Sequence, residues 1–160
     1  METRNHSRVV SMVAVALLAA AAVAATPPTV RGSFDVGGVE AGLRQGRATS
    51  VALDEKTSGY AVLLSARKAE GDLGPWRIGD PEERGSFIFL IVEKSGAVWI
   101  AEIAHAAAKT RRFGVVTEVQ VKDFHAQSGR VSGKLTTGGE QIFTEDHYRI
   151  DLEFDLPLEP

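Results

Sequence analysis

Apolar and charged residues alternate strictly near the end of the chain. Because successive side chains of a β-strand point to opposite faces, this pattern predicts a strand with one dry face and one wet face, as in an antiparallel sheet packed on one side. Pro157 has no backbone N–H and is expected to end the strand. The apolar set is Tyr148, Ile150, Leu152, Phe154 and Leu156, and the charged set is Arg149, Asp151, Glu153 and Asp155.

A different pattern, a continuous apolar run, occupies residues 87–92 with the sequence FIFLIV. Its aromatic and branched side chains and its length favour a central strand. Since such a run has no polar face, it needs cover on both sides, which favours a two-layer sandwich. Trp99 alternates with Ala97 and Ala101 and is expected in the core.

Short segments of strand character, separated by glycine-rich turns, recur along the rest of the chain. Gly37-Gly38 predicts a two-residue hairpin turn after 33–36. The stretch 101–109 is compatible with a strand or with a short helix, because alanine is the best helix former. Together the elements predict an all-β domain over 33–158, an antiparallel two-layer β-sandwich, immunoglobulin-like in a broad sense. The other expected strands are 47–53, 60–65, 97–103, 115–124, 130–136 and 141–143.

The first 25 residues follow the secretory pattern. A polar start with Arg4 and Arg8 precedes an uncharged apolar run, 9–25, which ends in small residues. The alternative, a transmembrane anchor, is disfavoured because the run is short and rich in alanine. We therefore expect a signal peptide over 1–25, cleaved after Ala24 or Ala25, a short linker over 26–32 and a periplasmic or extracellular protein without a transmembrane anchor after cleavage.

Composition narrows the function classes. The chain has 160 residues, a formal net charge of −3 and no cysteine. The absence of cysteine excludes disulfides, thiolate metal sites and a cysteine nucleophile. The slight acidic excess argues against a partner made of nucleic acid, since such binders carry a basic excess.

The segment 69–84 interrupts the strand pattern. It is rich in acidic residues, glycine and proline, and loops this long are often functional. Trp76 and Arg77 are candidate binding residues here, because an exposed aromatic beside an arginine can stack on a sugar ring or anchor a protein. The alternative is that Trp76 folds back onto one end of the domain. The acidic segment would also suit a periplasmic inhibitor or immunity protein.

The densest basic cluster contains Lys109, Arg111 and Arg112, and it is a candidate binding site for an anionic surface. The alternative is an ordinary solvated loop. Three histidines lie beyond the N-terminal segment, 20 and 22 residues apart, without the short spacing of a zinc site. His125 and His147 lie next to acidic residues and would serve an alternative function, a hydrolase or metal-dependent enzyme. No cofactor and no metal are predicted.

Four segments together resemble small exported bacterial β-sandwich proteins of uncharacterised function. The segments are 32–38, 60–65, 131–137 and 148–158. The resemblance implies the fold and the export, and it implies no functional residue. The leading hypothesis is therefore a secreted or periplasmic, non-enzymatic binding or envelope-associated protein, whose partner is an envelope protein or a glycan.

Overall fold

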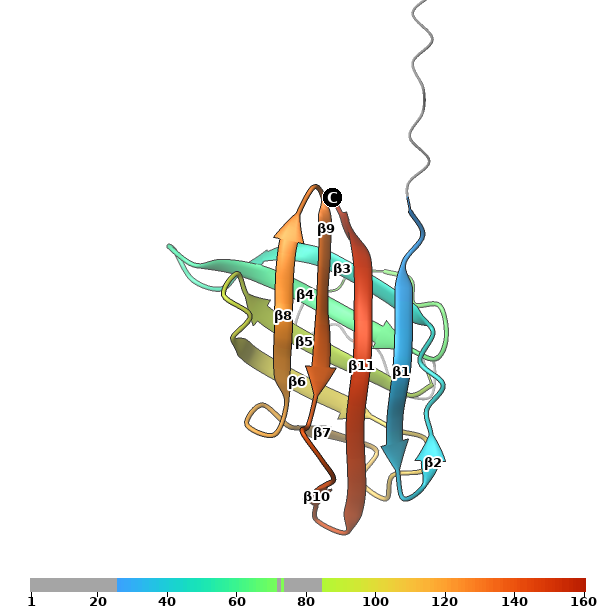
Figure 1. Cartoon of the computed structure of the whole chain (residues 1–160). Coiled ribbons are helices and arrows are strands. Elements are labelled where there is room, and N and C mark those ends of the chain that lie inside the picture. The colour runs from blue at the N-terminus through green and yellow to red at the C-terminus, as the bar shows by residue number, and fades with distance from the viewer. Residues whose placement is uncertain (1–25, 72, 74–84) are drawn as a thin grey trace, which may run out of the picture.

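The structure is a computed structural model that describes residues 26–71, 73 and 85–160. The described residues are all-β and contain no helix, which confirms the predicted class (Figure 1). The stretch 101–109 is strand as far as Ala104 and turn afterwards. The strands of the structure are β1 (Thr29–Val36), β2 (Val39–Glu40), β3 (Gln45–Ala52), β4 (Ser58–Ser65), β5 (Phe87–Glu93), β6 (Val98–Ala104), β7 (Arg112–Gly114), β8 (Gln120–Gln127), β9 (Arg130–Thr136), β10 (Gln141–Phe143) and β11 (Asp146–Glu159).

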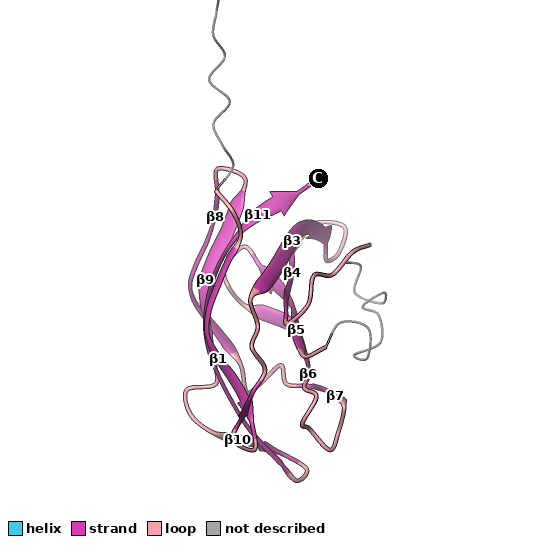
Figure 2. Ribbon diagram, turned by 90° about the vertical axis from the view of Figure 1, so that its right-hand side faces the viewer, coloured by secondary structure: helices cyan, strands magenta, loops and turns pink. Residues whose placement is uncertain are grey.

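The strands form one curled sheet with two halves. In one half β11 is central, with β1 and β9 as its antiparallel neighbours, while β2 extends β1 and β8 extends β9. In the other half β3, β4, β5, β6 and β7 follow one another as antiparallel neighbours. Figure 2 shows the two halves facing each other, so that the sheet has the shape of a half-barrel.

The end of β11 joins the two halves. Leu158 and Glu159 pair with Ala48 and Thr49 of β3 in parallel orientation, so the sheet is mixed and the prediction of a purely antiparallel sheet is wrong at this place. Pro157 also does not end the strand as predicted. It lies opposite Arg130, at the point where β11 leaves its antiparallel neighbours, and the next residue donates its N–H to the Gly129 carbonyl at 2.8 Å.

The core has two parts, one on each face of the second half. The larger cluster lies between the halves and contains the inward side chains of β11, which confirms the alternation predicted for that strand. The smaller cluster lies on the opposite face of β4 and β5 and includes Leu63, Phe87 and Phe89. The run 87–92 is therefore buried on both faces, as its lack of a polar face predicts.

Three local expectations fail. Trp99 is 44% exposed, not buried in the core. Ile91 pairs with Ile100 and Val92 with Val98, so Trp99 is the extra residue of a β-bulge, which turns its side chain away from the alternating pattern. The strand expected at 115–124 begins only at Gln120, and the segment before it is turn. β1 begins at Thr29, inside the segment expected as linker.

Candidate functional site

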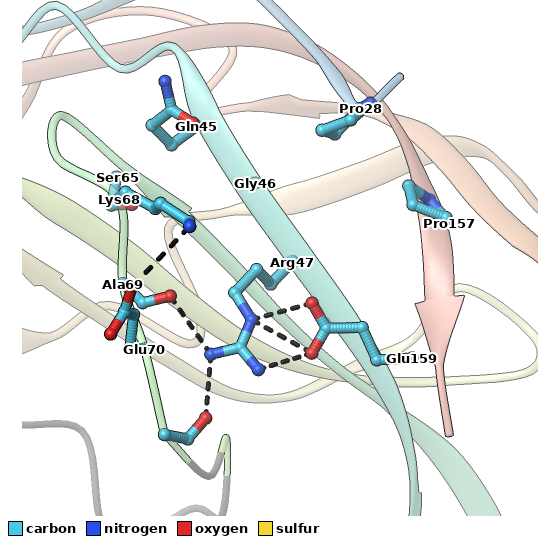
Figure 3. A pocket seen from close by; sticks show the side chains of 11 residues that line it. Pro28, Gln45, Gly46, Arg47, Ser65, Lys68, Ala69, Glu70, Pro157 and Glu159 are labelled. Atoms are coloured by element: carbon cyan, nitrogen blue, oxygen red, sulfur yellow. Dashed lines mark hydrogen bonds and ion pairs between the residues drawn. The ribbon is translucent and has the colours of Figure 1, made fainter. Parts of the chain in front are cut away.

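A pocket of about 480 Å³ lies where the end of β11 meets β3. Figure 3 shows that Arg47 crosses it from β3 toward Glu159 of β11 and toward the backbone after Lys68. The volume is within the usual range for small-molecule sites. The lining residues are Pro28, Gln45, Gly46, Arg47, Ser65, Lys68, Ala69, Glu70, Gly71, Pro157 and Glu159.

The Arg47 side chain is the centre of this pocket. Its Nε donates to both carboxylate oxygens of Glu159 at 2.8 and 3.0 Å, and its Nη2 also bonds to Glu159. Its Nη1 donates to the carbonyls of Ala69 and Gly71 at 3.2 and 2.8 Å. Planar, bidentate contacts of this kind are charge-assisted and fix both partners. Arg47 therefore connects β3, the end of β11 and the chain after β4.

The rim of the pocket is polar and balanced in charge. Lys68 Nζ lies 3.6 Å from a Glu70 carboxylate oxygen, and both side chains are largely exposed. Gln45 is exposed, whereas the hydroxyl of buried Ser65 donates to a backbone carbonyl at 2.7 Å. Pro28 contributes an apolar ring on one side. Both cations of the pocket, Arg47 and Lys68, thus lie within ion-pair distance of a carboxylate.

Sequence reasoning did not find this site. Its central ion pair joins residues 112 positions apart, and each partner alone is an ordinary charged residue of a strand. No local motif could have shown the pairing, because it depends on the parallel contact between β11 and β3.

The predicted binding residues Trp76 and Arg77 lie outside the described residues, as does most of the acidic segment 69–84. Of that segment the structure describes 69–71 and 73. Ala69 and Leu73 are buried in the smaller core cluster, and Gly71 bonds to Arg47.

The basic cluster is part of a network of ion pairs. Lys109 Nζ bonds to Glu145, and Arg112 donates to both carboxylate oxygens of Glu102, at 2.6 Å from Nη2. Arg111, which lies between Lys109 and Arg112 in the sequence, is exposed. These pairs, formed by exposed side chains except for the half-buried Glu102, compensate the positive charge that the sequence suggested for an anionic surface.

The backbone of this cluster is held by Asp146, which is buried. Its two carboxylate oxygens accept the N–H groups of Lys109 and Thr110, both at 2.9 Å. Burial alone would raise the pKa of Asp146. The bonds from the Thr110 and Lys109 backbones, with the nearby charges of Lys109 and His105, outweigh that effect and lower the pKa below its ordinary value.

The structure does not bring His125 and His147 together. His125 pairs with Ser132, which in turn pairs with Asp155, while His147 lies eight residues earlier on β11. At about 3.3 Å per residue this separates them by roughly 26 Å along the sheet. His147 Nδ1 lies 3.0 Å from Glu140, and both side chains are exposed. Within the described ranges, no three His, Asp or Glu side chains are placed to hold a metal ion.

In the part of the chain that the structure describes, no helix could cross a membrane. Comparison with protein-family models, with curated proteins and with solved structures finds no match.

Proposed function

We propose that the protein is an exported, non-enzymatic binding protein of the bacterial envelope, and that its ligand is a neutral glycan bound in the Arg47 pocket. The observation that carries the proposal is the paired state of the charges in the pocket. Because the Arg47 guanidinium is occupied by Glu159 and two carbonyls, an ionic ligand would have to break these bonds to use it. A sugar needs no such exchange.

The remaining groups suit a saccharide. The amide of Gln45 and the ends of Lys68 and Glu70 offer both donors and acceptors at the rim. The rings of Pro28 and Pro157 offer apolar surface. A sugar presents hydroxyl groups and apolar C–H faces together, so it can use both kinds of contact.

The proposal of export rests on the apolar N-terminal segment, 9–25, and on the small residues at its end. Its test is a fusion of residues 1–25 to a reporter that is active only outside the cytoplasm, together with mass spectrometry of the secreted chain. We expect reporter activity and a new N-terminus after Ala24 or Ala25. An inactive reporter would contradict export, whereas an active reporter with a retained N-terminal segment would contradict cleavage and favour the transmembrane anchor.

We also infer that the half-barrel is a variant of the two-layer β-sandwich, immunoglobulin-like in a broad sense. The support is that both halves of the sheet contribute inward side chains to the same core cluster. The resemblance to small exported bacterial β-sandwich proteins agrees with this inference.

Glycan binding is tested by amide NMR on the purified, untagged protein, because a C-terminal tag would lie beside Glu159. The probes are neutral oligosaccharides and peptidoglycan fragments, with inorganic phosphate as the anionic comparison. We expect saturable shifts of the pocket amides with at least one saccharide and none with phosphate.

The matched variants are the double substitutions Gln45→Ala/Lys68→Ala in the pocket and Gln120→Ala/Lys94→Ala outside it, all at exposed positions. The pocket variant should lose about tenfold or more in affinity, which is about 1.4 kcal/mol, and the other should bind as the parent does. No saturable binding of any saccharide, or equal binding by both variants, would overturn the proposal.

A further inference from the structure

His105 is a buried histidine directly after β6, and it does not line the proposed glycan pocket. Only 3% of its surface is exposed. The edge of its ring contacts Phe34 of β1, with the centroids 5.0 Å apart and the planes at 87°. Such burial holds the imidazole in one orientation, so its two nitrogens have separate roles.

The hydrogen bonds define the protonation state. Nδ1 accepts the backbone N–H of Ala107 at 3.0 Å and therefore carries no proton. The proton of the neutral ring must lie on Nε2, for which no hydrogen bond of normal geometry is found among the described residues. A second proton would have to go to Nδ1, where it would face the Ala107 N–H, donor against donor.

The turn that this bond closes leads from β6 to the three-residue edge strand β7. Ala108 N donates to the His105 carbonyl at 3.1 Å, and Ala106 N donates to the Ser86 hydroxyl at 3.1 Å. The next two N–H groups are those that Asp146 accepts. Each N–H group from Ala106 to Thr110 thus has an acceptor, and the loss of the His105 acceptor breaks this series near its start and weakens the turn.

We propose that His105 is an acid-sensitive latch, which in its neutral form holds the turn 105–110 closed and on protonation opens it. The opening would loosen the segment that carries Lys109, Arg111 and Arg112 and its pairing with Asp146. The proposal does not depend on the glycan site.

Burial and the neighbouring polar groups have opposite effects on the pKa of His105. Burial is the largest effect and lowers the pKa of His105 below its ordinary value of 6.5. The Val39 carbonyl of β2 and the carboxylates of Asp35 of β1 and Asp146 of β11 favour the charged ring but do not outweigh burial. The stabilisation from the neutral ring is therefore complete above pH 6.5 and is lost as the pH falls through the lowered pKa.

The test is hydrogen exchange of the purified protein at about pH 7.5 and about pH 5.5, corrected for the intrinsic exchange rates. We expect the amides of 106–110 to exchange faster at the acidic pH, by up to about tenfold, the limit for the uptake of one proton over this range, while those of β9 and β11 keep their protection.

Two variants distinguish the latch from general acid sensitivity. In His105→Asn the side-chain oxygen stands near the position of Nδ1 and can still accept the Ala107 N–H, but it does not titrate. This variant should keep the turn equally protected at both pH values. In His147→Gln, where the replaced histidine is exposed, the acid response should equal that of the parent. Equal protection of the parent at both pH values, or an unchanged acid response in His105→Asn, would overturn the proposal.

If His105→Asn does not fold, NMR titration of the parent decides. The imidazole of His105 should titrate below its ordinary pKa of 6.5, and the Ala107 amide signal should move with it. A His105 titration to which the Ala107 amide does not respond would reject the latch.

Discussion

At the scale of single residues, β11 shows how strand register determines which positions tolerate substitution. Phe154 points into the larger core cluster, whereas Glu153 is exposed between two basic residues, Arg31 of β1 and Lys134 of β9. Adjacent positions on one strand therefore have very different tolerance to substitution. Sequence alternation identifies the inward residue, but only the pairing shows which charges flank the outward one.

We predict that Phe154→Asp destabilises the domain by about 3–5 kcal/mol, because it removes a core ring and buries a charge. Glu153→Gln should change the free energy of unfolding by less than about 0.5 kcal/mol. Glu153→Lys should cost about 1 kcal/mol, since it creates three cations in a row across the sheet. Urea unfolding measures all three, and equal effects of Phe154→Asp and Glu153→Gln would refute the register.

Gly32 is a second position at which the backbone determines how much a substitution destabilises the protein. Its φ is +104°, and a Cβ there would lie 2.1 Å from the carbonyl oxygen of Asp151, a backbone atom that cannot move away. Gly139 has open space around its Cα and no positive φ. We predict that Gly32→Ala destabilises the protein by about 2 kcal/mol or more, while Gly139→Ala stays within about 0.5 kcal/mol. Thermal unfolding compares the melting temperatures of the two variants. Similar melting temperatures would contradict the close approach of Gly32 to the Asp151 carbonyl.

At the scale of elements, bulges and turns modify what the alternating pattern implies. The bulge in β6 places Trp99 on the surface, where its indole N–H bonds to Glu93 of β5. A second irregularity between β8 and β9 coincides with Asp123, whose φ is +50°. Such bulges depend on the partner strand, so neither is visible in the residue pattern of one strand alone.

The surface position of Trp99 gives a fluorescence prediction. In Trp76→Phe, which leaves Trp99 as the remaining tryptophan, the emission of the folded protein should be red-shifted and strongly quenched by acrylamide. Unfolding should then change the emission maximum only slightly, because the indole is already in contact with water. A blue-shifted, unquenched emission would place Trp99 in the core and reject the bulge.

At the scale of the whole molecule, the contact between β11 and β3 joins the two halves of the sheet. The Arg47–Glu159 pair stands at this contact, with side chains 24% and 35% exposed. Partial burial makes the pair stronger than an ordinary surface pair, because water screens it less. It thus contributes to the closure of the half-barrel as well as to the pocket.

A double-mutant cycle measures this closure. We predict a coupling free energy of about 1–2 kcal/mol between Arg47→Met and Glu159→Gln, with the arginine variant the less stable single mutant because Arg47 also binds two carbonyls. The same cycle on the exposed Lys68–Glu70 pair, whose atoms are 3.6 Å apart, should give almost no coupling. Comparable coupling in the two cycles would show that the central pair does not join the sheet halves.

The sequence by itself determined the class of structure and most strand positions, since alternation in β11 and the apolar run in β5 are local patterns with a direct physical meaning. It also predicted the hairpin at Gly37-Gly38, where both residues have positive φ. These features depend on neighbouring residues and on burial of one or both faces, so they can be read in a single segment.

Only the tertiary structure decided how these strands pair, and with that the pocket, the surface position of Trp99 and the surroundings of His105. The parallel contact of β11 with β3 brings together charges 112 residues apart, and the bulge depends on the register of β5 with β6. His105 contacts Phe34 of β1 and faces the charges of Asp35 of β1 and Asp146 of β11. The physical reason is the same in each case: long-range pairing sets which side chains meet, and no local pattern encodes a partner so distant in the chain.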